Sequence, residues 1–458
     1  MLQATEYTVR DYLVWYHRTK DFAHVERRRQ FVKTPKAILL LTIALVFILL
    51  LWGGAIWVFF IATSPLRYMW ALLILFLSPY VVAYGMVIPL LAIRILIQWP
   101  LESLILRRAR ERLQAHKAVK IGIAGSFGKT TMREILKAVL SEGRRVAAPP
   151  HSYNTPLGIS RFVKTLKGDE EILIFEFGEY YPGDVTKLCD LVRPSIGIIT
   201  GVNEAHLEKF KSLERTTKTI YELADYLGKK PMYVNGENER ARNNARPVHT
   251  VYSRESVGEW KIENQKTDLT GTAFTLVKNN TRLELASGLL GLHQIGPLAA
   301  ACDIARSLGS SPADIRSGVS KTKPFSHRLE PRGDSAGVIT LDDSYNGNPD
   351  GVQAAIDFLA SLKDCRRWYV TPGLVEMGIR TREVHREIGR SLARARIEKV
   401  VLIKNSVTSS IEEGLREEGY RGDTLWFDDA LAAYAALPHL TAKGDVALLQ
   451  NDWPDQYQ

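Results

Sequence analysis

The chain opens with two long apolar runs and then changes to short apolar segments that alternate with amphipathic ones. The runs Ala37 to Ala62 and Met69 to Ile93 contain no charged residue. Each is longer than the roughly 20 residues that a helix needs to cross a bilayer. Only the short segment Thr63 to Tyr68 separates them. The pattern therefore predicts a hairpin of two transmembrane helices over residues 37–93.

Basic residues flank this hairpin on both sides. They are Arg27, Arg28, Arg29, Lys33 and Lys36 before it, and Arg94, Arg107, Arg108, Arg110 and Arg112 after it. Positive flanks stay on the cytoplasmic side, so we expect a multi-pass membrane protein whose main body and both termini are cytoplasmic. Residues 1–36 are predicted to form a juxtamembrane segment, either an amphipathic helix on the membrane surface or a solvated helix. Residues 94–117 are predicted to be a basic helical connector.

From Val119 onward the pattern is typical of an α/β protein with parallel sheets. A central domain is expected over 118–325, with strands at Val119–Ala124, Ile172–Gly178 and Ile196–Thr200. A second alternation predicts a Rossmann-like C-terminal domain over 326–458. Its expected strands are Gly337–Leu341, Arg367–Thr371, Lys399–Lys404, Thr424–Phe427 and Asp445–Leu449.

Charge and cysteine content narrow the possible functions. The net charge is +10, but much of the excess lies around the hydrophobic N-terminal region. No recognition motif for nucleic acid accompanies this charge, so nucleic-acid binding is not expected. The three cysteines, Cys189, Cys302 and Cys365, are far apart and show neither metal-ligand spacing nor a disulfide framework.

The most informative segment follows the first strand of the central domain. It consists of Gly125, Ser126, Phe127, Gly128, Lys129, Thr130 and Thr131, and the next residues predict a helix. Glycines let backbone N–H groups approach a polyphosphate, and the helix N-terminus favours negative charge. A lysine here reaches the terminal phosphates, and a threonine hydroxyl can hold Mg²⁺. The segment therefore predicts a phosphate-binding loop for ATP and Mg²⁺.

Polar residues at the ends of two further strands extend this site. Glu176 ends an apolar strand, and His206 follows the next one. Parallel strands end at one edge of a sheet, so we expect both beside the loop, with Thr130, Glu176 and His206 around Mg²⁺. For each residue alone a structural role remains open: Glu176 as a buried carboxylate satisfied by a cation, and His206 as a packing histidine.

Several motifs, in order along Val119 to Val446, resemble the Mur ligase family. They are the Gly125–Thr131 loop, Tyr153-Asn154-Thr155-Pro-Leu-Gly158, Phe175-Glu176-Phe-Gly178, Glu204-Ala-His206-Leu-Glu208, Gly291-Leu-His293-Gln294, His327-Arg328-Leu-Glu330 and Asp342-Asp343-Ser-Tyr345-Asn346-Gly-Asn348-Pro349. The last is similar to a signature of the family's D-alanyl-D-alanine-adding branch.

The resemblance implies an ATP-dependent amide ligase for a cell-wall precursor. In this family a carboxylate takes the γ-phosphate of ATP, and an amine then displaces phosphate from the acyl phosphate. The implied catalytic residues are Lys129, His206 and Arg328. Besides the loop, the implied ATP-binding residues are His293, Gln294, Arg328, Asp343 and Asn346, and the implied substrate-binding residues are Asn154, Thr155, Tyr345 and Asn348. Asn346 and Asn348 could equally be turn residues before Pro349.

Two departures from the family leave alternatives open. Ile220 stands where the family has a modified lysine, which favours a membrane-tethered, non-catalytic ATP-binding scaffold. The retained Lys129 and Arg328 argue against that alternative. The membrane hairpin occupies the position of the family's UDP-sugar-binding domain, so we hypothesise a membrane-associated or lipid-linked acyl substrate. A ligase for a different polymer and another phosphotransferase with a phosphate-binding loop remain further alternatives.

Overall fold

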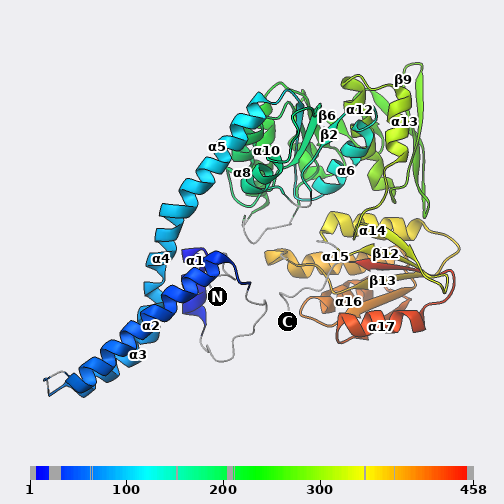
Figure 1. The fold of residues 1–458 in the computed structure, drawn as a ribbon. Coiled ribbons are helices and arrows are strands. Elements are labelled where there is room, and N and C mark those ends of the chain that lie inside the picture. The colour runs from blue at the N-terminus through cyan, green and yellow to red at the C-terminus, as the bar shows by residue number, and fades with distance from the viewer. Residues whose placement is uncertain are drawn as a thin grey trace. The chain divides into compact units, whose positions relative to one another are not determined.

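The computed structural model divides into two units, Met1–Arg107 and Arg108–Gln458 (Figure 1). It describes residues 7–19, 32–61, 63, 65–150, 153–203, 210, 212–344, 347–375 and 377–450.

The first unit is helical. Its elements are α1 (Val9–Arg18), α2 (Pro35–Ile61), α3 (Arg67–Gly85), α4 (Val87–Ile93), a π-helical turn η1 (Arg94–Gln98) and the first part of α5 (Trp99–Ala115). The segments Pro35–Ile61 and Arg67–Ala115 are long and apolar enough to cross a membrane, by length and composition alone. The predicted hairpin therefore exists as two helices, whereas its insertion in a membrane stays a prediction.

Apolar side chains of this unit point outward. Phe60 is 71% exposed and Phe76 is 72% exposed, and a small buried cluster forms around Leu40, Met86 and Leu90. The two helices approach closely at Gly85, where an added Cβ would lie 2.3 Å from the Phe47 ring. Exposed apolar surface on this scale marks an interaction with lipid or with another protein.

The second unit contains a ten-stranded sheet in the order β10-β9-β8-β7-β6-β5-β4-β1-β3-β2. Its parallel strands are β1 (Val119–Ala124), β2 (Val146–Ala147), β3 (Ile172–Glu176), β4 (Ile196–Ile199), β5 (Met232–Asn235) and β6 (Thr250–Tyr252). The antiparallel strands are β7 (Ser256–Val257), β8 (Trp260–Asp268), β9 (Gly271–Lys278) and β10 (Thr281–Ser287). The parallel strands agree with the sequence pattern, whereas the antiparallel extension was not predicted.

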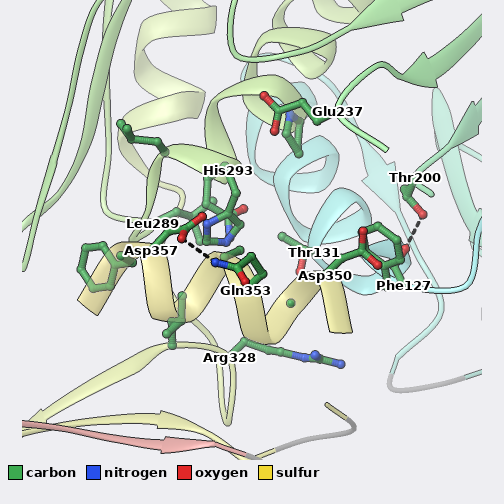
Figure 2. A pocket seen from close by; sticks show the side chains of 18 of the residues that line it. Phe127, Thr131, Thr200, Glu237, Leu289, His293, Arg328, Asp350, Gln353 and Asp357 are labelled. Carbon is green, nitrogen blue, oxygen red and sulfur yellow. Dashed lines mark hydrogen bonds between the residues drawn. The ribbon is translucent and has the colours of Figure 1, made fainter. Parts of the chain in front are cut away.

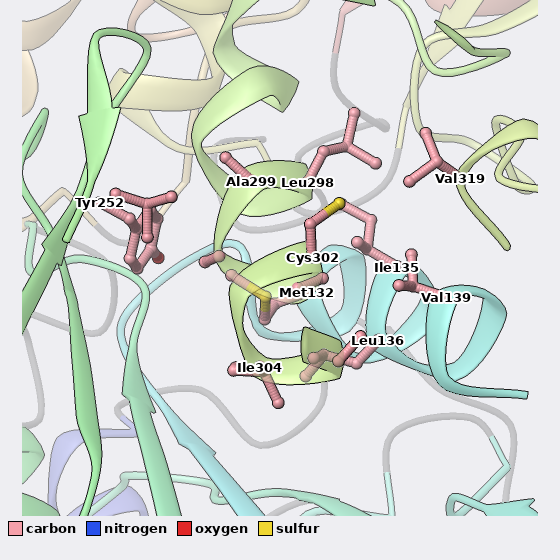
Figure 3. Packing of buried hydrophobic residues seen from close by; sticks show 14 of the residues in the cluster. Met132, Ile135, Leu136, Val139, Tyr252, Leu298, Ala299, Cys302, Ile304 and Val319 are labelled. Atoms are coloured by element: carbon pink, nitrogen blue, oxygen red, sulfur yellow. The ribbon is translucent and has the colours of Figure 1, made fainter. Parts of the chain in front are cut away.

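Helices cover this sheet and close its core. They are α6 (Lys129–Leu140), α7 (Pro156–Val163), α8 (Asp184–Val192), α10 (Leu213–Leu227), α11 (Glu239–Asn243), η2 (Leu292–Gln294), α12 (Ile295–Ser307) and α13 (Pro312–Ser320). Figure 3 shows α6 packing on α12, with Met132 and Ile135 against Cys302 in one apolar cluster. This packing fixes the helix that begins at the phosphate-binding loop.

A six-stranded sheet follows, in the order β11-β12-β16-β13-β14-β15. The strands are β11 (Glu330–Gly333), β12 (Ile339–Asp343), β13 (Arg367–Thr371), β14 (Lys399–Ile403), β15 (Asp423–Phe427) and β16 (Val446–Gln450). The helices are α14 (Pro349–Ser361), η3 (Gly378–Arg380), α15 (Thr381–Arg394), α16 (Thr408–Glu417) and α17 (Ala430–Leu440). All strands except β11 run parallel to their neighbours.

The predicted α/β class with parallel sheets is thus confirmed, and the five strands expected for the C-terminal domain are present. One local prediction needs correction. The strand expected over Gly337–Leu341 is β12, which begins at Ile339 and includes Asp342 and Asp343 as its last residues. The domain limits 118–325 and 326–458 stay predictions.

Candidate functional site

The phosphate-binding loop joins β1 to α6 and is fastened to the end of β4. Gly125 and Gly128 have φ of +148° and +74°, values that favour glycine. An added Cβ at Gly125 would lie 2.2 Å from the Thr200 hydroxyl oxygen. The Thr200 hydroxyl donates to the Phe127 carbonyl, and the Ser126 N–H donates to the Gly201 carbonyl over 2.9 Å. The glycines and the neighbouring strand therefore define the conformation of the loop in this structure.

Lys129 on the first turn of α6 is held by a carboxylate. Its Nζ lies 2.9 Å from both carboxylate oxygens of Glu179 and also donates to the Gly125 carbonyl. Glu179 is only 2% exposed. A polyphosphate that binds Lys129 must therefore compete with Glu179. Sequence reasoning missed Glu179, whose only signal was its place three residues after Glu176.

Glu176 lies beside this pair, as expected, and is buried. The Thr130 hydroxyl donates to Glu176 Oε2 over 3.0 Å, and Arg133 Nη1 lies 2.8 Å from Oε1. Burial raises the pKa of the Glu176 carboxyl, while Arg133 and Lys129 oppose that rise. Glu176 and Glu179 thus each pair with a cation in a buried cluster, and Arg133 also pairs with Glu134 over 2.7 Å at its margin.

The residues present fit Mg²⁺ only in part. Thr130 and Glu176 offer the oxygen ligands that Mg²⁺ prefers. Glu176 Oε1 is buried and accepts no hydrogen bond of good geometry, although it pairs with Arg133. Among the described residues, no cluster of three or more His, Cys, Asp or Glu side chains could hold a metal. A Mg²⁺ ion here would need phosphate oxygens to complete its shell.

A cavity of about 380 Å³ opens beside the loop, between the two sheets of the second unit (Figure 2). Its lining comes from the loop, from the segment around η2, from α14, and from the ends of β12 and β16. The predicted site residues in this lining are Phe127, Gly128, Thr131, His293, Gln294, Arg328, Asp343 and Asn348. The structure therefore brings together residues from motifs more than a hundred positions apart in the sequence.

One wall of the pocket carries His293 and Gln294. Gln294 Nε2 lies 2.7 Å from His293 Nε2. Burial, with a contribution from Arg254, lowers the pKa of His293 to about 4. The imidazole is therefore neutral near pH 7 and can offer one donor and one acceptor to a ligand. Arg254 itself pairs with Glu237 over 2.9 Å at this wall.

Arg328 and Asp343 belong to the opposite side, at the edge of the six-stranded sheet. The Gln450 amide donates to Asp343 Oδ2 over 2.9 Å, and the Leu329 N–H donates to Oδ1 over 3.2 Å. Burial raises the pKa of Asp343, and the hydrogen bond from Gln450 and the charge of Arg328 oppose that rise. Gln450 also lines the pocket, although it lies in none of the sequence motifs.

The remaining predicted residues have mixed outcomes. The Asn154 carbonyl accepts from Gly178 N–H over 2.9 Å, so it lies near Glu176. The Thr155 hydroxyl caps α7 by accepting from Gly158 N–H over 3.2 Å, and Asn348 caps α14. Their substrate-binding roles stay predictions. His206, Tyr345 and Asn346 lie outside the described residues. The side chain at the position of the family's modified lysine, Ile220, is fully buried in α10.

Comparison with known families gives two matches. Residues 123–305 match the Mur ligase middle domain, and residues 327–450 match the domain described as Mur ligase, glutamate ligase domain. Together these matches contain the loop, most of the pocket lining and most of both sheets.

Individual relatives agree. Over 341 residues the chain is 30% identical to the UDP-N-acetylmuramoyl-tripeptide–D-alanyl-D-alanine ligase of Mycobacterium tuberculosis, covering 72% of this chain and 66% of that protein. The Bacillus subtilis ligase of the same name is 25% identical over 346 residues, covering 75% of each. The chain thus spans about two thirds of the mycobacterial relative's length.

Solved structures show the same fold. MurF from Acinetobacter baumannii superposes with a TM-score of 0.67 at 20% identity, covering 76% of this chain and 77% of that one. MurF ligase from Thermotoga maritima, solved in complex with ADP, gives a TM-score of 0.66 at 24% identity, covering 78% and 81%. The resemblance inferred from the motifs is therefore confirmed, and the chain belongs to the Mur ligase family.

Proposed function

We propose that the protein is an ATP-dependent amide ligase of the cell-wall precursor type. It joins a carboxylate of a muramoyl peptide to an amine, D-alanyl-D-alanine or a similar dipeptide or amino acid. The observation that carries this proposal is the pocket between the two sheets, which has the phosphate-binding loop on one wall and Arg328 and Asp343 on the other. The names of the mycobacterial and Bacillus relatives support the same reaction.

The chemistry divides into two transfers. A carboxylate oxygen of the acyl substrate attacks the γ-phosphorus of ATP, the bond to the β–γ bridging oxygen breaks, and ADP leaves. The amine nitrogen then attacks the acyl carbon, the carbon–oxygen bond to phosphate breaks, and the amine loses a proton. Phosphoryl transfer depends mainly on positioning and charge neutralisation.

Several residues of this chain have proposed parts in those steps. The loop N–H groups and Lys129 hold the phosphates, and Arg328 approaches them from the C-terminal domain. His293 and Gln294 bind the nucleoside end. Thr130 and Glu176 would hold Mg²⁺, which supplies charge neutralisation when bound. His206 stays a candidate third ligand and catalytic residue by resemblance alone.

A product assay tests this proposal. The detergent-purified full chain receives Mg²⁺-ATP and a muramoyl tripeptide, with and without D-alanyl-D-alanine, and the products are identified by mass. The expected result is ADP release that depends on the amine, together with a ligated peptide. ATP binding without amine-dependent turnover would reject this substrate pair. It would favour the alternative of a non-catalytic scaffold, which the buried Ile220 supports.

We also propose that the N-terminal hairpin anchors the protein in a membrane, with the catalytic unit in the cytoplasm where ATP is present. Anchoring raises the local concentration of an acyl substrate that is itself membrane-associated or lipid-linked. Alkaline extraction of membranes should leave the full chain in the pellet. The lipid-linked substrate should be turned over faster than its soluble UDP-linked counterpart, and equal turnover of the two would reject the substrate hypothesis.

A further inference from the structure

A buried amide connects the two halves of the pocket. Asn203 follows β4 in the central domain and is 4% exposed. Its Nδ2 donates to Asn348 Oδ1 over 2.9 Å and to Asp350 Oδ2 over 2.7 Å. Asn348 and Asp350 belong to the N-terminus of α14 in the C-terminal domain. One side chain thus binds the cap and the first turn of a helix from the other domain.

Asn238, which caps α11, binds the same carboxylate. Its Oδ1 accepts from the N–H groups of Val202 (3.1 Å) and Ala241 (3.0 Å). Its Nδ2 donates to the Val202 carbonyl (3.2 Å) and to Asp350 Oδ1 (3.3 Å). These bonds use both donors and both acceptor positions of a carboxamide. Each oxygen of Asp350 therefore accepts an amide N–H from the central domain.

The segment held in this way continues into the phosphate-binding loop. Asn235 Nδ2 donates to the Thr200 carbonyl over 2.8 Å, which fixes the start of segment 200–203. The Gly201 carbonyl accepts from Ser126 N–H over 2.9 Å, and the Thr200 hydroxyl bonds to the Phe127 carbonyl. Figure 2 shows this last bond together with Asp350 on α14. Hydrogen bonds and backbone therefore run without interruption from α14 to the loop.

We propose that Asn203, Asn238 and Asp350 form a relay between the C-terminal domain and the phosphate-binding loop. Through this relay the position of the C-terminal domain sets the conformation of the loop. Asn203 and Asn238 are buried and Asp350 is half-buried. Buried amides are costly to leave unpaired, so the relay favours one closed arrangement over intermediate ones. Asn203 is not among the described residues that line the pocket, so it is a positioning residue that acts through its partners. The relay goes beyond the proposed function and requires only that the loop binds nucleotide.

Asn203→Ala, Asp350→Ala and the double variant test the relay in the full chain. Weaker closure lowers the fraction of protein competent to bind, so each single variant should raise the Kd for Mg²⁺-ADP about tenfold. Hydrogen exchange of the peptide containing residues 125–131, measured without nucleotide, should become faster. The double variant should be no worse than the worse single variant, because both changes break one connection.

Asp428→Ala is the matched control, since it removes an exposed carboxylate of the same domain that pairs with Lys404. Its ADP affinity and loop exchange should match the wild type. Asn203→Ser, a milder loss of both amide donors, replaces the alanine variant if that variant unfolds.

Unchanged loop exchange in the Asn203 and Asp350 variants, or strictly additive effects, would overturn the relay. So would weaker ADP binding in Asp350→Ala alone, because Asp350 would then act by direct contact with nucleotide. A failed ligation assay would leave these measurements unaffected, so the two proposals fail separately.

Discussion

The two ends of the pocket are held by different kinds of group. At the phosphate-binding loop, buried ions balance one another, with Lys129 on Glu179 and Arg133 on Glu176. At the N-terminus of α14, the amides of Asn203 and Asn238 hold a single carboxylate. We propose that the first arrangement exchanges one anion for another, with phosphate replacing Glu179 as the partner of Lys129. The second arrangement joins the two domains mainly through neutral amides and contains a single charged group, Asp350. On this view the charged end responds to the negative charge of the ligand, and the amide end responds to the position of the C-terminal domain.

The largest effect is expected at the charged end. Lys129→Ala should lower ATP turnover at least about a hundredfold, since it removes the one cation of the loop itself that can meet the phosphates. Insertion of the hairpin should be unchanged. Amine-dependent ADP release measures the turnover, and alkaline extraction of membranes measures the insertion of the hairpin. Undiminished turnover would mean that the loop is not the phosphate site.

The alanine variant also leaves Glu179 buried without Lys129, which can reduce folding stability. The double variant Lys129→Ala/Glu179→Gln removes both charges and serves as its control. If the double variant regains the wild-type melting temperature and still lacks turnover, the lost activity belongs to the lysine and not to unfolding.

An intermediate effect is expected for Glu179→Gln alone. A neutral amide competes less well than a carboxylate for Lys129, so the Kd for Mg²⁺-ADP should fall about fivefold. Titration calorimetry on the full chain gives the value. A weaker affinity would show that Glu179 supports nucleotide binding, and the exchange of anions proposed for this end would be wrong.

The smallest effect concerns pH, and its sign differs between the charged end and α15 of the C-terminal domain. His385 of α15 is buried, accepts from Leu374 N–H over 2.8 Å and contacts the Thr381 carbonyl at 2.6 Å. Burial lowers its pKa below the ordinary 6.5, so its contribution to stability is complete above that value and is lost as the pH falls. Glu176 has a raised pKa, so protonation as the pH falls from above that pKa toward the ordinary 4.5 favours the folded form.

Acid sensitivity that begins near pH 6.5 should therefore originate in the C-terminal domain. Hydrogen exchange is measured at pH 7.5 and 5.5, and each rate is divided by the intrinsic amide exchange rate at that pH. Protection around His385 should be lower at pH 5.5, with no comparable change around Glu176. In His385→Gln the difference between the two pH values should shrink. An unchanged difference in that variant would place the sensitive group elsewhere.

Local patterns were sufficient to predict the phosphate-binding loop and Glu176 at the charged end. Glycine spacing, Lys129 and the strand that ends at Glu176 are contiguous signals, so the loop and its neighbours could be found by reading along the chain. Glu179 was missed because its partnership with Lys129 depends on the position of β3 beside β1. In β8, buried Trp260 and Ile262 alternate with exposed Lys261, a pattern typical of an antiparallel strand with one solvated face.

The amide end could not be predicted in this way. Asn203 and Asp350 are 147 residues apart in the sequence, and neither residue type indicates a distant partner. The motif around Asn348 suggested a substrate contact or a turn, whereas the structure makes Asn348 a helix cap that also binds Asn203. Contacts between domains follow from tertiary geometry, which a local pattern does not contain.

The side-chain amide of Asn238 has all its donors and acceptors in hydrogen bonds, and this restricts which C-terminal domains of related ligases can replace the one in this protein. Aspartate would lose both donors, serine would lose at least one, and glutamine would place its amide one methylene farther out. A chimera that receives the C-terminal domain of another ligase would retain the contact only if that domain brings an acid at the position of Asp350. Exchange of C-terminal domains between related ligases is therefore expected to succeed only when the two domains carry matching residues at the positions of Asn238 and Asp350.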